Sequence, residues 1–119
     1  MKKTTVLLTI ISLIIGAGIG CNEDNPTELA WINDTDVTLN EIIWTRDAGW
    51  DVGQLNFDQI WNNGYNDGQK TEFKEVNVLD GYVIGVDDSM NEVTVIIEGT
   101  ISNSLSLHEG SSEVYTITK

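Results

Sequence analysis

The feature that most constrains the fold is a series of short apolar runs separated by turn residues. Val37–Arg46, Tyr82–Val86 and Glu113–Thr118 are rich in β-branched and aromatic residues, which is typical of strands. Clusters of Gly, Asn, Asp and Ser interrupt such runs about every eight to twelve residues, and no long amphipathic helix pattern occurs. The sequence therefore predicts an all-β fold, a small antiparallel β-sandwich of about seven strands.

Most of the expected strands have clear boundaries: Leu29–Ile32, Val37–Arg46, Thr71–Leu79, Tyr82–Val86, Glu92–Ile101, Leu105–Leu107 and Glu113–Thr118. Leu55–Trp61 fits a strand and equally fits one helical turn opened by Asn56. In the second strand, strict alternation puts Leu39 and Ile43 on one side and Trp44 on the other. Asp80-Gly81 predicts a tight hairpin turn.

The first 21 residues have the organisation of an export signal. Lys2 and Lys3 precede an uncharged, largely apolar run of 17 residues, Thr4–Gly20, and Cys21 follows directly. A basic start, an apolar middle and a small-residue end are typical of a secretory signal peptide. Two alternatives stay open: an uncleaved membrane anchor, which the short run disfavours, and a secreted form cut by the ordinary signal peptidase. All three put the rest of the chain outside the cytoplasm.

Gly20 followed by Cys21 resembles the lipobox of bacterial lipoproteins. In that family the cysteine thiol receives a diacylglyceryl group, and a dedicated signal peptidase cuts just before the cysteine. The resemblance implies cleavage between Gly20 and Cys21 and lipid attachment at Cys21. One position departs from the family pattern, because Gly18 stands where a branched aliphatic residue is usual. Asn22 follows the cysteine, which implies delivery to the outer membrane if the organism has one.

The chain divides into three expected parts: a signal peptide (1–20), a lipidated tether (21–28) and a β-sandwich domain (29–119). The tether is polar and has no hydrophobic pattern. It is short enough to keep the domain close to the bilayer. Cys21 is the one cysteine in the sequence, so no disulfide can form within the chain. Acylation would also protect an exported thiol from oxidation.

The expected mature chain is strongly acidic. All 19 acidic residues and four of the six basic residues lie after Gly20, so its net charge would be −15. Nucleic-acid binding needs clustered Lys and Arg, and this charge excludes it. Anionic lipid head groups are repelled as well. The protein would therefore contact the membrane through the lipid on Cys21.

No set of residues predicts catalysis or a metal centre. His108 is the only histidine, and the serines near it lack the Gly-x-Ser-x-Gly nucleophile elbow. We therefore expect no enzyme, no catalytic residue and no cofactor. The pairs Asp34/Asp36 and Asp87/Asp88 and the segment Asn62–Asp67 offer oxygen ligands suited to calcium. None has EF-hand spacing, and Asp and Asn also favour turns, so no metal site is assigned.

Aromatic residues beside polar loops are the remaining candidates for a binding site. Trp50, Trp61 and Tyr65 lie in or next to loops rich in Gly, Asn and Asp. Exposed rings at such positions could stack on sugars, since binding residues are often placed on loops of a rigid scaffold. The alternative is that these rings cap one end of a small core.

A second resemblance concerns the domain itself. Ile32-Asn33-Asp34-Thr35, Ile42-Ile43-Trp44, Gly68 with Phe73, and Gly81-Tyr82-Val83-Ile84-Gly85-Val86-Asp87 follow one another in that order. This order resembles small exported β-sandwiches of transthyretin-like or immunoglobulin-like topology. Many such domains occur on lipoproteins without an assigned activity, so the resemblance bears on fold and not on function.

The function predicted from these features is that of a lipid-anchored, non-catalytic binding module in the bacterial cell envelope. It would dock to another envelope protein, and its acidity leads us to expect a basic patch on that partner. The alternative is a surface lipoprotein domain that binds a glycan or calcium.

Overall fold

The part of the chain that is described forms nine β-strands and no helix. The computed structural model describes residues 25–47 and 57–119. The strands are β1 Glu28–Asp34, β2 Leu39–Thr45, β3 Phe57–Trp61, β4 Lys74–Glu75, β5 Asp80–Asp87, β6 Glu92–Val93, β7 Ile96–Ile97, β8 Ser104–Ser106 and β9 Ser112–Thr118. Four of them have only two or three residues, so β1, β2, β3, β5 and β9 carry most of the architecture.

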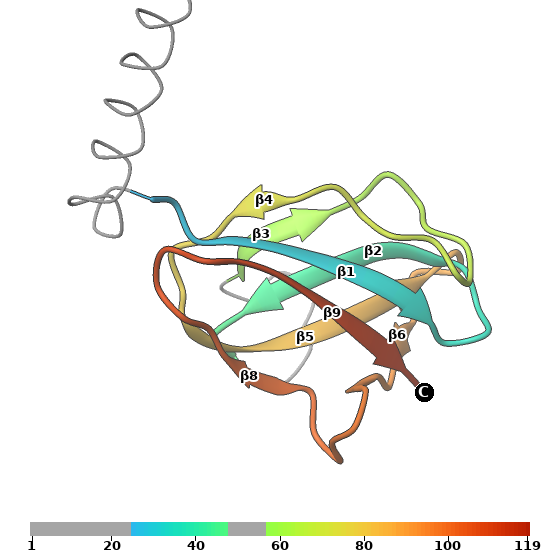
Figure 1. The fold of residues 1–119 in the computed structure, drawn as a ribbon. Helices are drawn as coiled ribbons and strands as arrows, with labels where there is room; N and C mark the ends of the chain where they lie inside the picture. Colours follow the sequence, from blue (N-terminus) through green and yellow to red (C-terminus); the bar gives the residue numbers. More distant parts are fainter. Residues whose placement is uncertain (1–24, 48–56) are drawn as a thin grey trace, which may run out of the picture.

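The strands form two sheets packed face to face, as Figure 1 shows. One sheet has the order β4-β1-β9-β7, and the other has the order β3-β2-β5-β6 with β8 also paired to β5. The predicted all-β sandwich is confirmed. All strand pairs are antiparallel except β1 and β9, which run parallel from Glu28↔Ser112 to Asp34↔Thr118.

Three tryptophans from both sheets form the centre of the core. Trp31 on β1 faces Trp44 on β2 and Trp61 on β3, with ring centroids 6.1 Å apart in each pair. Tyr115 on β9 lies 6.3 Å from Trp31. All three indole side chains are fully buried. In a domain of this size, buried aromatic rings supply a large share of the apolar surface removed from water.

A β-bulge in β2 changes which residues face this core. The pairing of β2 with β5 shifts between Leu39 and Glu41, so Leu39 joins Ile42 and Trp44 in the core. The expectation that Leu39 shares a side with Ile43 is therefore wrong. An extra residue in a strand reverses the alternation beyond it, and the sequence pattern did not reveal it.

Ile43 belongs to a second buried apolar cluster. Ile43, Ile84 and Val86 form this cluster, and Ile60 packs against it. Ile43 pairs with Ile60 on one side and with Ile84 on the other, so the row crosses three strands. Because strand side chains alternate, this row lies on the opposite face of the five-stranded sheet from the tryptophans.

The expected hairpin turn at Asp80-Gly81 is wrong. Both residues lie inside β5 and pair with Ser106 and Leu105 of β8. Glycine is needed at position 81 for close packing, since a Cβ there would lie 2.6 Å from the carbonyl oxygen of Thr45 and 3.0 Å from the ring of Trp44. The DG dipeptide marks a close approach and not a turn.

The expected strand Glu92–Ile101 is divided between the two sheets. β6 pairs with β5 in the five-stranded sheet, whereas β7 pairs with β9 in the four-stranded sheet. Gly99 then adopts a φ of 84°, and the chain turns back. The expected strand Thr71–Leu79 is likewise reduced to the two residues of β4. In contrast, the ambiguous Leu55–Trp61 run resolves into a strand over Phe57–Trp61.

The folded domain begins earlier than the expected boundary at residue 29. Thr27 is buried, and its side-chain oxygen accepts a hydrogen bond from the backbone of Gly110 at 2.8 Å. Its carbonyl oxygen accepts a second bond from Val76. Glu28 is the first residue of β1. The last two residues of the predicted tether are therefore part of the sandwich.

Candidate functional site

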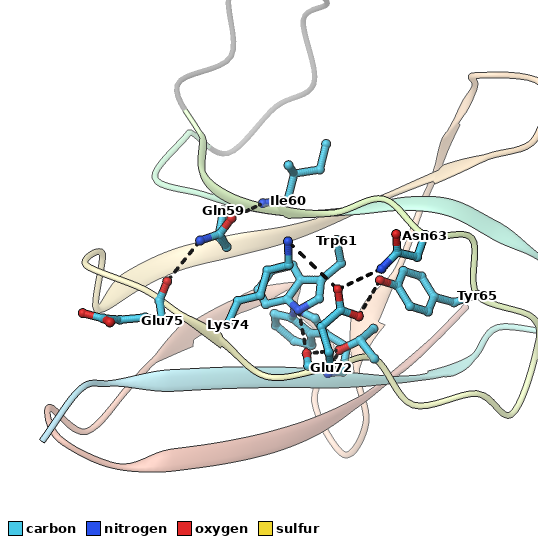
Figure 2. Close-up of polar contacts among 10 residues, drawn as sticks. Gln59, Ile60, Trp61, Asn63, Tyr65, Glu72, Lys74 and Glu75 are labelled. Atoms are coloured by element: carbon cyan, nitrogen blue, oxygen red, sulfur yellow. Dashed lines mark hydrogen bonds and ion pairs between the residues drawn. The ribbon is translucent and has the colours of Figure 1, made fainter.

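The best-defined polar cluster joins β3 to the segment that follows it, and Figure 2 shows its contacts. The indole N–H of Trp61 donates to the backbone oxygen of Glu72 at 2.8 Å. The Glu72 carboxylate accepts hydrogen bonds from the Tyr65 hydroxyl at 2.8 Å and from the Asn63 amide at 3.1 Å. Lys74 lies 4.0 Å from the same carboxylate. An exposed ion pair at that distance contributes little stability, so the hydrogen bonds define the cluster.

These contacts hold the loop over the edge of the core. Trp61 is fully buried and Tyr65 is 4% exposed. Burial and the hydrogen bond to Glu72 raise the pKa of Tyr65 from 10.0 to about 12. Tyr65 also exchanges two backbone hydrogen bonds with Leu39. The cluster fastens the long 62–72 segment to β2 and β3.

Two of the three aromatic residues considered for sugar binding, Trp61 and Tyr65, are buried. The rings of Trp61 and Tyr65 pack in the core, so in this arrangement neither has a free face for stacking on a sugar. Trp61 contacts Trp31 at the centre of the core, and Tyr65 belongs to the same buried cluster. Trp50, the third ring, lies outside the described residues, as do Gly20 and Cys21 of the predicted cleavage and lipid site.

The surroundings of His108 do not assemble a nucleophile. Ser111 Oγ lies 2.7 Å from the His108 backbone oxygen and 2.9 Å from the Glu113 carboxylate. The His108 backbone N–H also donates to Glu113, so these contacts involve the main chain of His108. The hydroxyl of Ser106 donates to Asp80, and that of Ser112 donates to the Glu28 carboxylate. These hydroxyls make turn and cross-strand contacts.

The carboxyl group of Glu113 on β9 has a pKa below the ordinary value for glutamate. Partial burial alone would raise its pKa, but hydrogen bonds from Tyr115, Ser111 and the His108 backbone outweigh burial and lower it. Burial and the Glu113 carboxylate in turn raise the pKa of Tyr115 to about 12. The Tyr115–Glu113 pair parallels Tyr65–Glu72, because in each pair the tyrosine hydroxyl donates to a glutamate carboxylate.

The Asp- and Asn-rich loops use their oxygens within turns. One carboxylate oxygen of Asp87 accepts backbone hydrogen bonds from Ser89 and Asn91, each at 2.9 Å. The Asp67 carboxylate accepts the backbone N–H of Asp36 at 2.9 Å. Within residues 25–47 and 57–119, no group of three or more potential metal ligands comes together.

A shallow groove at the edge of the five-stranded sheet is the feature that sequence reasoning missed. Here the chain leaves that sheet after β6, forms β7 in the other sheet, and returns to pair with β5 in β8. The groove has a volume of about 270 Å³. Its apolar lining includes Val93, Ile96 and Ile101. The side chain of Ile101 is 98% exposed, the most exposed large apolar residue in the described part of the chain.

Comparisons with known proteins do not assign the chain to a family. No family model matches it, and neither the curated proteins nor the solved structures contain a match. In the described residues, no helix is both long and apolar enough to cross a membrane.

Proposed function

We propose that this protein is a lipid-anchored binding module on the extracytoplasmic face of a bacterial envelope membrane. It docks to another envelope protein and does not act as a catalyst. Cys21 carries the lipid after cleavage behind Gly20, and Asn22 directs the protein to the outer membrane where there is one. The Lys2–Gly20 pattern and the position of Cys21 support this anchoring.

The observation that carries the docking proposal is the acidic surface on a rigid two-sheet scaffold. The chain has 19 acidic residues against six basic ones. Acidic side chains stay exposed on the described surface, among them Asp34, Asp67 and Asp88. Fields of one sign steer association with a partner of opposite charge. A protein with a basic patch is therefore the expected partner.

The polar clusters support a scaffold role for the loops. Glu72 and Glu113 each hold a tyrosine of the core, and Asp87 organises a turn. These carboxylates stabilise loop geometry. Exposed acidic groups around them remain available for a partner.

The test is affinity capture of the full-length protein, tagged after Lys119, from native membranes in mild detergent. We expect one envelope protein in near-stoichiometric amount, and we expect its recovery to fall steeply as ionic strength rises, because salt screens charge-steered contacts. A Cys21→Ser variant tests the anchor, and it should leave the membrane fraction. If wild-type protein is captured alone at low ionic strength, the docking proposal fails.

A further inference from the structure

The groove where the chain crosses between the sheets has the properties of an interaction surface. On the side away from β2, β5 pairs with β6 through Gly85 and Val86 and with β8 through Asp80–Tyr82. Between these two pairings, Val83 exchanges hydrogen bonds with Asn103 at 2.9 and 2.8 Å. The residues between β6 and Asn103 are displaced towards the other sheet. The crossover groove, as we call it, occupies this gap and is lined by Ile84, Glu92, Val93, Ile96, Ile101 and Asn103, among others.

The turn that carries Ile101 is held in one conformation by hydrogen bonds. The backbone N–H of Ile97 donates to Ser102 at 2.9 Å, and that of Thr100 donates to Ile97 at 3.0 Å. Thr100 Oγ1 lies 2.8 Å from the carbonyl oxygens of both Ile97 and Ser102, and it accepts the Ser102 N–H at 3.1 Å. Gly99 takes the left-handed conformation that the turn needs. The isoleucine is thus presented without a large loss of loop freedom on binding.

Ile101 differs from an isolated apolar residue on a surface, which needs no explanation. It lies at the rim of a groove lined by β-branched apolar residues together with the polar residues Glu92, Thr94, Ser102 and Asn103. Loop tips usually carry polar residues. An exposed apolar side chain on a hydrogen-bonded turn, with apolar and polar groups beside it, matches the apolar anchor and polar rim of protein interfaces.

Charge and position define the partner. Glu92 lines the groove, and Glu98 begins the turn that presents Ile101. Lys119 follows β9, whose Thr118 pairs with Ile96. The whole chain carries −13. In Figure 1 the loop between β6 and β8 projects from the lower edge of the sandwich, whereas the chain enters β1 at the upper left. The segment between β6 and β8 therefore lies away from the point where the chain enters the sandwich.

We infer that the crossover groove is the docking site for a protein partner, with Ile101 inserted into an apolar pocket whose rim carries Lys or Arg. This inference rests on the proposed function and adds the surface that performs it. The apolar contact supplies affinity, and the charges around it set orientation and partner choice.

The experiment compares capture of the partner by four full-length proteins: wild type, Ile101→Asn, Glu98→Lys and the matched control Phe73→Asn. Phe73 is 40% exposed and adjoins β4, at the edge of its sheet opposite β7. Quantitative mass spectrometry of the captured complex is the readout. We expect recovery to fall about tenfold or more with Ile101→Asn, to fall with Glu98→Lys, and to be unchanged with Phe73→Asn. The melting temperature of Ile101→Asn should equal that of wild type, because the side chain is almost fully exposed.

The results with wild type and Ile101→Asn distinguish a failure of the groove as docking site from a failure of the proposed function. If wild type captures a partner and Ile101→Asn captures the same amount, the groove is not the docking site and the proposed function stands. If wild type captures nothing, both fail. A photo-crosslinking amino acid at position 101 identifies the occupant. An adduct with a second copy of this chain, or with lipid alone, overturns the inference, whereas an adduct with the captured protein near its Lys and Arg residues supports it.

Discussion

Replacing Trp31 and Trp44 in turn by Phe tests the account of the core, because the two indoles differ in one contact. Both side chains are fully buried, and their rings are 6.1 Å apart. The indole N–H of Trp44 donates to the backbone oxygen of Val78 at 2.9 Å. In contrast, Trp31 Nε1 is a buried polar atom without a hydrogen-bond partner, the one such side-chain atom among the described residues.

The difference between the two variants follows from that contact. Each Trp→Phe change removes the same atoms from a buried site, so the loss of packing is similar to first order. Trp44→Phe also leaves the Val78 oxygen without its donor, which costs about 1–3 kcal/mol. Trp31→Phe removes an unsatisfied donor and relieves a penalty of about the same size. Even at the lower bound of each term, Trp31→Phe should retain about 2 kcal/mol more stability than Trp44→Phe.

The assay is urea unfolding followed by far-ultraviolet circular dichroism, since tryptophan fluorescence would change with the substitutions themselves. Thermal unfolding of the same variants provides a second readout. A stability difference of about 2 kcal/mol corresponds to a melting temperature difference of about 8 °C or more in a domain of this size. Trp61→Phe should lose less stability than Trp44→Phe, because the Glu72 oxygen that accepts its indole N–H at 2.8 Å also accepts the Thr71 hydroxyl at 2.9 Å. If Trp31→Phe is as destabilising as Trp44→Phe, the hydrogen-bond argument is refuted.

Three further predictions concern stability and are each measured by unfolding. Gly81→Ala should lower the free energy of unfolding by about 1–3 kcal/mol, because the new Cβ would lie 2.6 Å from a backbone oxygen. Gly85→Ala should lower it less, because the nearest atoms, at 3.2 and 3.3 Å, are side-chain methyls that can shift. Equal losses of stability in the two variants would contradict this difference. Asn33→Asp should lower the free energy of unfolding by at least about 2 kcal/mol, since the buried amide donates to two carbonyl oxygens at 2.9 Å that a carboxylate would repel. Unchanged stability would contradict these two hydrogen bonds. Folding stabilises the neutral forms of Tyr65 and Tyr115, because it raises their pKa values from 10.0 to about 12. Their contribution to the free energy of unfolding should therefore be complete below pH 10 and decline towards pH 12. The melting temperature of the double Tyr→Phe variant should fall less between pH 10 and pH 12 than that of wild type. An identical fall would show that the two tyrosines do not cause the loss of stability.

The fold class could be predicted because it depends on composition and period, which the sequence displays directly. Short β-branched runs with turn residues between them form strands, and the sheets built from them bury their apolar faces by packing against each other. Asn33 and Thr35 illustrate the same point locally, because an Asn-Asp-Thr turn is readable from the sequence and the Asn33 side chain does accept hydrogen bonds from Thr35.

The details that could not be predicted depend on contacts between distant residues. The bulge near Leu39 and the close approach at Gly81 are set by the partner strand β5 and by Trp44. The division of Glu92–Ile101 depends on β5 and β9 being available as separate partners. A single chain segment carries no signal for such tertiary choices.

The candidate site shows the same limit. The aromatic side chains near polar loops were recognisable, but sequence alone could not separate exposed rings from rings turned into the core. Trp61 and Tyr65 are buried because the 62–72 segment returns across them to hydrogen-bond through Glu72. Ile101 was missed for the opposite reason, because it ended an apolar run and resembled a core residue of a strand.

We propose that the protein is held on a membrane through Cys21 and acts by docking to another protein. Native mass spectrometry of the full-length protein, solubilised from its own membranes in mild detergent, tests both parts in one spectrum. We expect a chain that begins at an acylated Cys21, in a complex with one further protein. A chain that still begins at Met1 would contradict the anchor, and an acylated chain that is detected alone at low ionic strength would contradict the docking.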